Sequence, residues 1–220
     1  MTPRYARWCA VLVIVLAATV RLWDLGGRSF SALEVARINA AEQLTISPES
    51  TDNFDPFPLW LTHLMLRYGY REGVVRLPAA LAGAAALGAM WLLGKQLLGW
   101  EGALYVTLLL AASPLHIQLS RLVGPDPWLV LAMLAGILAL WHALRGWDAV
   151  RPWLAVGVAG CLACVCGYAG LLLPVIVAAA ILIAAERQRR CSIRRSGGAL
   201  SVARLAGGGS TGPCQCSAGR

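Results

Sequence analysis

Five charged side chains lie beside apolar stretches of the sequence and could perform chemistry. Three are the carboxylates Glu34, Asp55 and Asp126, and two are the guanidinium groups of Arg76 and Arg121. A carboxylate can take a proton from a hydroxyl group, and a guanidinium offers a fork of N–H donors that matches phosphate oxygens. Charged groups at the edge of apolar segments are candidates for function by default. These residues predict a site that handles a proton and an anion.

Each of these residues also has a structural interpretation. Ser31 and Glu34 fit a capping box, in which two side chains satisfy free amides at a helix start. Asp126 follows Arg121 by five positions and directly precedes Pro127. Aspartate is a common N-cap residue, and proline is common at the first helical position, so Asp126 could be the N-cap of a helix. Asp55 could cap or solvate a proline-rich turn. Arg76 and Arg121, like Arg21, could extend to lipid headgroups.

The elements that must position these residues are membrane-spanning helices. The chain has 220 residues, of which 58% are hydrophobic and 14% charged, and its mean hydropathy is +0.65. About 25% of residues are charged in a typical soluble domain, so this composition argues against one. Because about 20 mostly apolar residues cross a bilayer, the sequence predicts six spans. They are Tyr5–Leu22, Val74–Leu93, Ala103–Leu119, Pro127–Leu144 and two helices within Pro152–Ala185, divided by a bend at Gly167–Gly170 and Pro174.

The segment Trp23–Gly73 is too polar to cross lipid and predicts a large aqueous or interfacial loop. A helix that starts near Ser31 is expected to lie on the membrane surface, with Glu34 away from its apolar face. That face comprises Leu33, Ala36, Ala40 and Leu44. A second apolar piece, Leu59–Tyr70, is too short to span and is placed at the interface as well.

We therefore expect an all-α fold: a polytopic transmembrane helix bundle of about six spans, with interfacial helices in the first non-cytoplasmic loop. If the N-terminus is cytoplasmic, 10 Lys and Arg residues lie on the cytoplasmic side and 7 on the opposite side. The positive-inside rule therefore favours this orientation. The expected localisation is a multi-pass protein of a bacterial-type plasma membrane. Glu34, Asp55 and Asp126 should then converge at one wet pocket on the outer rim.

The net charge of +8 does not indicate a nucleic-acid partner. Residues 1–186 carry 12 basic and 11 acidic side chains, whereas residues 187–220 carry seven arginines and no acid. We divide the chain into a transmembrane region, 1–186, and a basic Gly/Ser-rich tail, 187–220, that is expected to be disordered. A frameshift or a truncated gene is an alternative origin of this tail. The histidines and cysteines lack a shared ligand spacing, so no metal site and no disulfide framework is predicted.

Several short motifs, taken in order, make the chain similar to a known family. It resembles the polytopic GT-C glycosyltransferases that use polyprenyl-phosphate sugars, such as protein O-mannosyltransferases and lipid A aminoarabinose transferases. The resemblance covers about Ala10 to Glu186 and corresponds to the N-terminal half of such an enzyme. The matching motifs are Arg21–Gly26, Glu34–Glu42, Asp55–Trp60, Arg76–Leu81, Ser113–Pro114 and Ser120–Asp126.

The resemblance implies sugar transfer from a polyprenyl-phosphate donor to a hydroxyl of a glycan, lipid or protein on the non-cytoplasmic side. Glu34 and Asp126 become candidate catalytic carboxylates, and Asp55, Arg76 and Arg121 candidates for binding donor or acceptor. No cofactor is assigned, and the need for a divalent metal stays open.

Three family positions differ in this chain. The family has an Asp-Glu pair after the first span, and its Asp position is Leu33 here. Either Glu34 substitutes for that Asp or the chain is inactive. The family's Lys-Pro or His-Pro motif is Asp55-Pro56, and the lysine of the later bend has no counterpart near Tyr168-Ala169. A non-catalytic membrane scaffold or a transporter fragment is the alternative function.

Overall fold

The computed structural model describes residues 3–27, 29–43, 55–145, 150–183 and 186, and the secondary structure of this part is helical. The chain divides into two units, residues 1–176 and 177–220, and the arrangement below concerns the first. The predicted tail, 187–220, lies outside the described residues. The elements in order are α1 (Pro3–Leu22), α2 (Ala32–Gln43), α3 (Pro56–Leu66), α4 (Glu72–Ala112), α5 (Pro114–Ser120), α6 (Asp126–Arg145), α7 (Val150–Val165) and the 3₁₀ turn η2 (Tyr168–Leu171).

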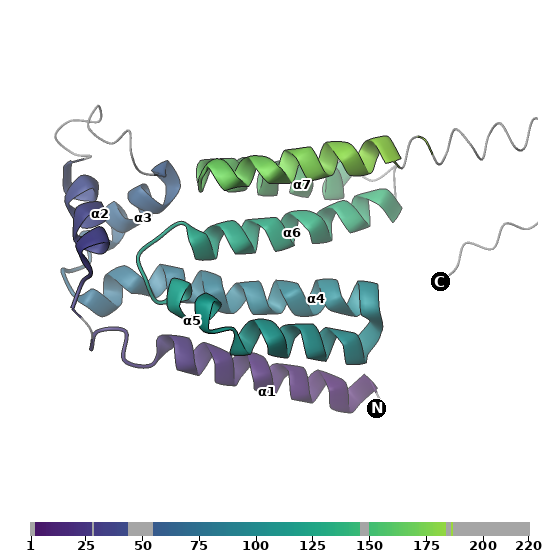
Figure 1. The fold of residues 1–220 in the computed structure, drawn as a ribbon, viewed down its shortest axis with the longest axis horizontal. Helices are drawn as coiled ribbons and strands as arrows, with labels where there is room; N and C mark the ends of the chain where they lie inside the picture. The colour runs from purple at the N-terminus through teal and green to yellow at the C-terminus, as the bar shows by residue number, and fades with distance from the viewer. Residues whose placement is uncertain (1–2, 28, 44–54, 146–149, 184–185, 187–220) are drawn as a thin grey trace, which may run out of the picture. The chain divides into compact units, whose positions relative to one another are not determined.

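The long helix α4 is a hairpin of two arms. Gly99 has φ +78°, a left-handed conformation that only glycine adopts at little cost, and the helix reverses direction there (Figure 1). A Cβ on Gly94 would lie 2.9 Å from the Cα of Ala103, so glycine at this position permits the close approach of the arms. The predicted second span thus falls on the first arm of α4, and the predicted third span, Ala103–Leu119, begins on the second arm and continues into α5.

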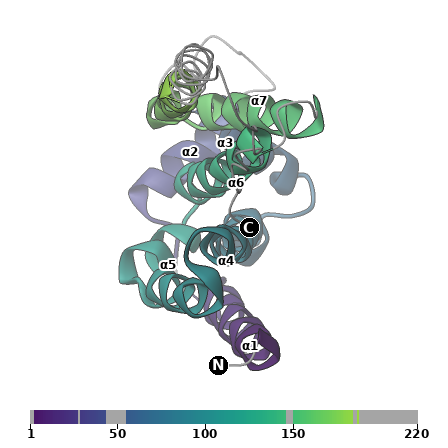
Figure 2. The same ribbon diagram turned by 90° about the vertical axis from the view of Figure 1, so that its right-hand side faces the viewer.

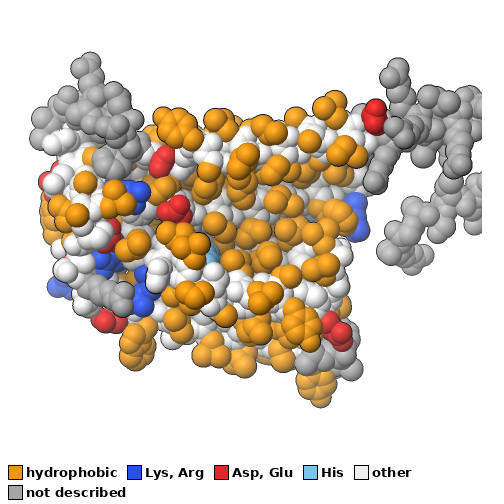
Figure 3. Space-filling model, viewed as in Figure 1, with side chains coloured by type: hydrophobic (Ala, Val, Ile, Leu, Met, Phe, Trp, Pro, Cys, Tyr) orange, Lys and Arg blue, Asp and Glu red, His pale blue; other side chains and the backbone are white. Residues whose placement is uncertain are grey.

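The helices of the first unit lie side by side, and α4 is central among them. Both α1 and α6 pack against α4, and α7 packs against α6 (Figures 1 and 2). Because the outer surfaces of these helices are covered by hydrophobic side chains, they suit a lipid environment (Figure 3).

The all-α prediction is confirmed, whereas six spans are not all evident. Among the described residues, three helices are long and apolar enough to cross a membrane: α1 from Tyr5, α4 and α6. Two shorter apolar helices follow, Val150–Val165 and Tyr168–Ile183. They meet at Gly167, whose φ of +144° produces the bend predicted in this region.

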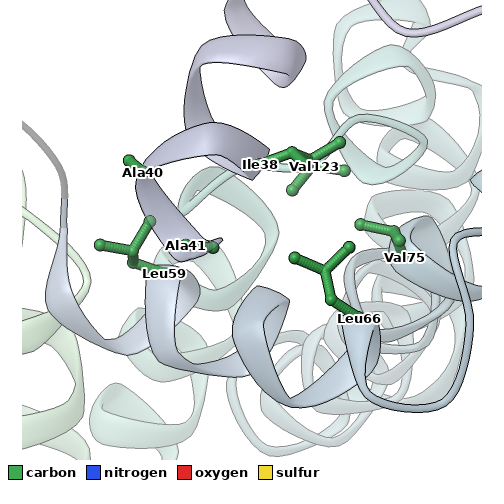
Figure 4. Close-up of a cluster of buried hydrophobic side chains, with 7 residues drawn as sticks. All are labelled: Ile38, Ala40, Ala41, Leu59, Leu66, Val75 and Val123. Carbon is green, nitrogen blue, oxygen red and sulfur yellow. The ribbon is translucent and has the colours of Figure 1, made fainter. Parts of the chain in front are cut away.

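The surface helices α2 and α3 are fixed to one end of the bundle by a small apolar core (Figure 4). The core consists of Ile38, Ala40 and Ala41 of α2, Leu59 and Leu66 of α3, Val75 of α4 and the loop residue Val123. Each buried Leu, Ile or Val contributes about 1.5–3 kcal/mol relative to an exposed one. These helices therefore hold their side chains in fixed positions relative to α4 and the loop that precedes α6.

The predicted apolar face of α2 is wrong at Leu33 and Ala36, whereas Ala40 is buried as expected and Leu44 lies outside the described residues. Leu33 and Ala36 are exposed, with Leu33 at 57% exposure, whereas Glu34 is only 2% exposed. The reason is that Glu34 finds cationic and amide partners inside the protein, so its burial costs less than the burial of an unpaired carboxylate.

Arg21 also differs from its prediction as a residue that reaches the headgroups. Its side chain is fully buried at the end of α1, near His116, and its Nη1 donates to the carbonyl of Ala17 at 2.9 Å. A carbonyl oxygen has two lone pairs, so that of Ala17 can accept this donor in addition to a backbone amide of the helix.

Candidate functional site

Glu34 of α2 and Arg76 of α4 form a buried, two-pronged ion pair. Arg76 Nη2 lies 2.9 Å from Glu34 Oε2, and Arg76 Nε lies 3.0 Å from Glu34 Oε1. Both side chains are at most 4% exposed. A forked arginine–carboxylate contact fixes both groups in orientation as well as in distance.

Glu34 also accepts two backbone amides. The amide of Ser31 donates to Oε2 at 2.9 Å, and the amide of Val123 donates to Oε1 at 3.1 Å. The predicted capping box is present, since the amide of Glu34 donates to Ser31 Oγ at 3.3 Å. Burial, the largest influence, raises the pKa of Glu34, but Arg76 and the two amides together bring it below the ordinary value. This carboxylate is therefore held ionised.

Arg76 uses its other donors to fasten the chain between α1 and α2. Its Nη1 donates to the carbonyl of Leu25 at 3.0 Å, and its Nη2 donates to the carbonyl of Ser29 at 3.2 Å. The ring of Phe30 lies 5.1 Å from the guanidinium carbon. With these contacts and the Glu34 pair, Arg76 is engaged in organising the site.

A cavity of about 470 Å³ borders this ion pair. Its lining is Asp24, Leu25, Ser29, Ser31, Glu34, Arg76, Ile117, Gln118, Arg121 and Leu122. Arg121 donates through Nη2 to the carbonyls of Trp23, at 2.8 Å, and Asp24, at 3.2 Å. Its Nε and Nη1 make no hydrogen bond with the described residues, so they can donate to a guest in this cavity, which we call the Arg121 cavity.

Asp55 and Asp126 lie near a different opening, which Arg37 and Asp55 line. Asp55 precedes α3 as its N-cap residue, but its side chain makes no capping hydrogen bond. Burial raises the pKa of Asp55, the nearby Arg37 opposes that shift, and Asp126 adds to it. Asp126 is half-buried in the first turn of α6, one residue inside the helix rather than at its cap.

The structure corrects the expected single pocket. All three carboxylates lie at the same end of the bundle, but Glu34 borders the Arg121 cavity and Asp55 borders the Arg37 opening. Val123 stands between the two: its N–H donates to Glu34, and its carbonyl accepts from Arg37. Arg121 contacts Trp23 and Asp24, and we find it on the cavity side of this loop.

Sequence reasoning did not single out Arg37. The apolar face predicted for the surface helix leaves this residue out. Its spacing of three from Glu34 was the available signal, since residues three apart share a helix face. The fold turns that face toward the loop before α6. Among the described residues, no group of three His, Cys, Asp or Glu side chains is arranged to hold a metal ion.

The family description that matches the chain is dolichyl-phosphate-mannose-protein mannosyltransferase, over residues 53–206. The chain belongs to this family. No curated protein and no solved structure matches it. The mannosyltransferase match confirms the membership that the motifs indicated, and it includes Asp55, Arg76, Arg121 and Asp126 but not Glu34. By its description, the family uses a lipid-phosphate mannose donor.

Proposed function

We propose that this chain provides the donor-binding end of a membrane glycosyltransferase. Mannose, by the family description, would pass from a polyprenyl phosphate to an acceptor hydroxyl. In this reaction the acceptor oxygen bonds to the anomeric carbon as the bond from that carbon to the phosphate oxygen breaks. The polyprenyl phosphate departs with the electron pair, and a carboxylate takes the acceptor's proton.

The observation that carries the proposal is the Arg121 cavity. Its volume falls within the range of about 300–1,000 Å³ that is common for small-molecule sites. Nε and Nη1 of Arg121 could donate to phosphate oxygens and stabilise the charge that develops on the leaving group. Ser29, Ser31 and Gln118 line the same space with groups that suit sugar hydroxyls. The prenyl chain would extend along the apolar outer surface of the helices.

For the proton acceptor we favour Asp126 over Glu34. Both oxygens of Glu34 already accept N–H donors, and its lowered pKa weakens it as a base. Asp126 is half-buried at the start of α6, across the Val123 loop from the Arg121 cavity, and bears no such set of donors among the described contacts. The acceptor would therefore approach the donor over this loop, with its hydroxyl next to Asp126. Under this assignment Glu34 and Arg76 build the wall of the Arg121 cavity, and Leu33 needs no chemical role.

The opposite end of the bundle supports a cytoplasmic N-terminus, six spans and a non-cytoplasmic site. There the exposed Arg7 and Lys95 lie 4.8 and 4.4 Å from the ring of Trp100, and Arg145 lies 4.5 Å from that of Trp141. Lysine and arginine near span ends favour the cytoplasmic side, and tryptophan is enriched at both membrane interfaces. The six proposed spans are α1, the first arm of α4, its second arm together with α5, α6, α7 and Tyr168–Ile183.

Photolabelling of the full chain in proteoliposomes tests donor binding. The probe is a polyprenyl phosphate mannose that carries a diazirine on its prenyl chain, and unlabelled donor serves as competitor. We expect competitive labelling of the wild type and a loss of at least about tenfold in Arg121→Gln, because two phosphate donors are removed. Arg67→Gln is the matched control, since Arg67 is exposed and lies outside the cavity lining.

Transfer is measured in the same proteoliposomes with radiolabelled donor and a peptide rich in Ser and Thr. Competitive labelling with mannose on the peptide supports the proposed function. A wild type that inserts correctly but shows neither labelling nor transfer would overturn it and favour the non-catalytic membrane protein.

A further inference from the structure

Arg37 joins α2 to the loop that precedes α6. Its Nη1 donates to the carbonyl of Val123 and lies 2.8 Å from the point where a Cβ on Gly124 would stand. Asp126 Oδ2 is 3.6 Å from that same point. The absence of a side chain at Gly124 therefore gives the guanidinium and this carboxylate room on one side of the loop.

Asp55 approaches the same place from the start of α3. It shares the lining of the opening with Arg37 and Gly124, and its Oδ1 is 3.0 Å from the point where a Cβ on Gly167 would stand. The charged and titratable groups that face Asp55 are Arg37 from α2, Asp126 from α6 and the Cys166 thiol, which follows α7. Four segments of the chain thus surround one small cluster.

The charges of this cluster are unequal. Asp55 and Asp126 can carry two negative charges, and Arg37 supplies one positive charge. Burial raises the pKa of Asp55, Arg37 opposes that shift, and Asp126 adds to it, so the two acids act on each other as a carboxylate pair. Such a pair suits the acceptance of a proton from a hydroxyl group, because the first proton relieves the repulsion.

We propose that Arg37 is a positioning residue that holds Asp55 and Asp126 as a carboxylate pair for the acceptor's proton. The inference rests on the proposed function for its role in transfer. Arg37 touches neither sugar nor phosphate in this scheme. It fixes the Val123–Asp126 segment through the Val123 carbonyl, and its positive charge opposes the rise that burial causes in the pKa of Asp55.

The step balances within the reaction already written. The acceptor O–H bond breaks as its oxygen bonds to the anomeric carbon, and the proton moves to the Asp126 carboxylate. The electron pair of the broken sugar–phosphate bond leaves on the polyprenyl phosphate. The proton then returns to water, which restores the pair.

The first test needs no transfer activity. Dicyclohexylcarbodiimide reacts with protonated carboxyl groups, and mass spectrometry of the full chain in proteoliposomes locates the adducts on Asp55 and Asp126. Across a pH series we expect Arg37→Gln to extend Asp55 labelling upward by about one pH unit, because a nearby cation that favours the ionised form is lost. Arg37→Lys should restore most of the wild-type profile, and Arg67→Gln should leave it unchanged.

The second test measures transfer against pH. We expect Arg37→Gln to lower kcat by about 10–100-fold, to move the acidic limb of its profile to higher pH and to change the donor KM by less than about twofold. Gly124→Ala keeps the charge but pushes the guanidinium aside, so it should also lower kcat. It replaces Arg37→Gln as the test variant if Arg37→Gln fails to fold. Gly88→Ala is its control, since a Cβ at Gly88 meets nothing within 4 Å.

The outcomes separate the two proposals. If the wild type shows no transfer but Arg37→Gln still shifts the pH dependence of Asp55 labelling, the proposed function is overturned. The same result supports the proposal that Arg37 positions the carboxylate pair. An active wild type with unchanged labelling and kinetics in both Arg37→Gln and Gly124→Ala overturns the inference and leaves the proposed function standing.

Discussion

Glu34 and Asp126 lie at the same end of the helical bundle, yet their surroundings suit them to different tasks. Glu34 is buried and accepts donors from Arg76, Ser31 and Val123. Asp126 is half-buried at a helix start that borders a small opening. At the residue scale, the first carboxylate stabilises the site, and we propose that the second accepts a proton in it.

Replacement of Glu34 should destabilise the protein strongly. Glu34→Leu leaves the buried Arg76 without its carboxylate, which costs about 3–5 kcal/mol in the free energy of unfolding. The double variant Glu34→Leu/Arg76→Leu should recover part of that loss, because no unpaired charge remains. Unfolding by denaturant in detergent micelles measures both, and a Glu34→Leu protein as stable as the wild type would contradict the structural role.

The same pair predicts a loss of stability in acid. The pKa of Glu34 is lower in the folded protein than its ordinary value, so its contribution is fully present above that ordinary value. The contribution is lost as the pH falls through the lowered folded pKa. The unfolding midpoint measured from pH 6 to pH 3 should therefore decline more steeply in the wild type than in Glu34→Gln.

Substitution of Asp126 should stop transfer without unfolding the chain. Asp126→Asn keeps the shape of the side chain but removes its ability to take a proton, so we expect a fall of about 10²–10⁴-fold in kcat. Glu42→Gln is a suitable control, since it removes a carboxylate of α2 that lies outside the linings of the Arg121 and Arg37 openings. Wild-type turnover in correctly inserted Asp126→Asn would exclude this role.

At the element scale, the bend of α4 decides how the apolar stretches are arranged. The left-handed φ of Gly99 lets one long helix return along itself, and this places the segment before Ser113 beside the first arm. The loop with Arg121 then starts from the same end as α2 and α3. The site depends on this bend, although Gly99 lies at the opposite end of the bundle.

Two alanine substitutions should separate strain at this bend from side-chain contact. A Cβ at Gly99 or at Gly88 meets no atom within 4 Å, but only Gly99 has a positive φ. Gly99→Ala should cost about 1–2 kcal/mol, whereas Gly88→Ala, in a regular helix, should gain about 0.5–1 kcal/mol. Chemical denaturation in micelles measures both, and equal effects would show that the bend does not depend on its glycine.

At the scale of the whole molecule, the two ends of the bundle differ in chemistry. One end carries α2, α3 and the three candidate carboxylates, and the other carries the exposed cations that lie near Trp100 and Trp141. Because an apolar surface separates the ends, a membrane would place them in different compartments (Figure 3).

Labelling of single cysteines should reveal this orientation. In a cysteine-free background, Arg67→Cys beside α3 should react with a membrane-impermeant maleimide on intact cells. Glu101→Cys, just after the bend of α4, should react only after permeabilisation, since both positions are exposed in the fold. Reaction of both from outside would contradict a transmembrane α4 arm, and the reversed pattern would place the site in the cytoplasm.

The sequence by itself determined the helical class, the membrane character, the start of α2 and the bend at Gly167. These features follow from local properties: runs of apolar residues, a capping box between Ser31 and Glu34, and glycine where the backbone must turn. The ordered motifs also pointed to the mannosyltransferase family, because each short pattern was readable without contacts.

Only the tertiary structure decided which charges meet. Arg21 and Glu34 are buried, Leu33 is exposed, and Val123 separates two openings where one pocket was expected. These facts depend on contacts between residues far apart in the sequence, such as Glu34 and Val123, which are 89 positions apart. A charge can be buried only where distant partners compensate its lost hydration, and a local sequence pattern contains no record of such partners.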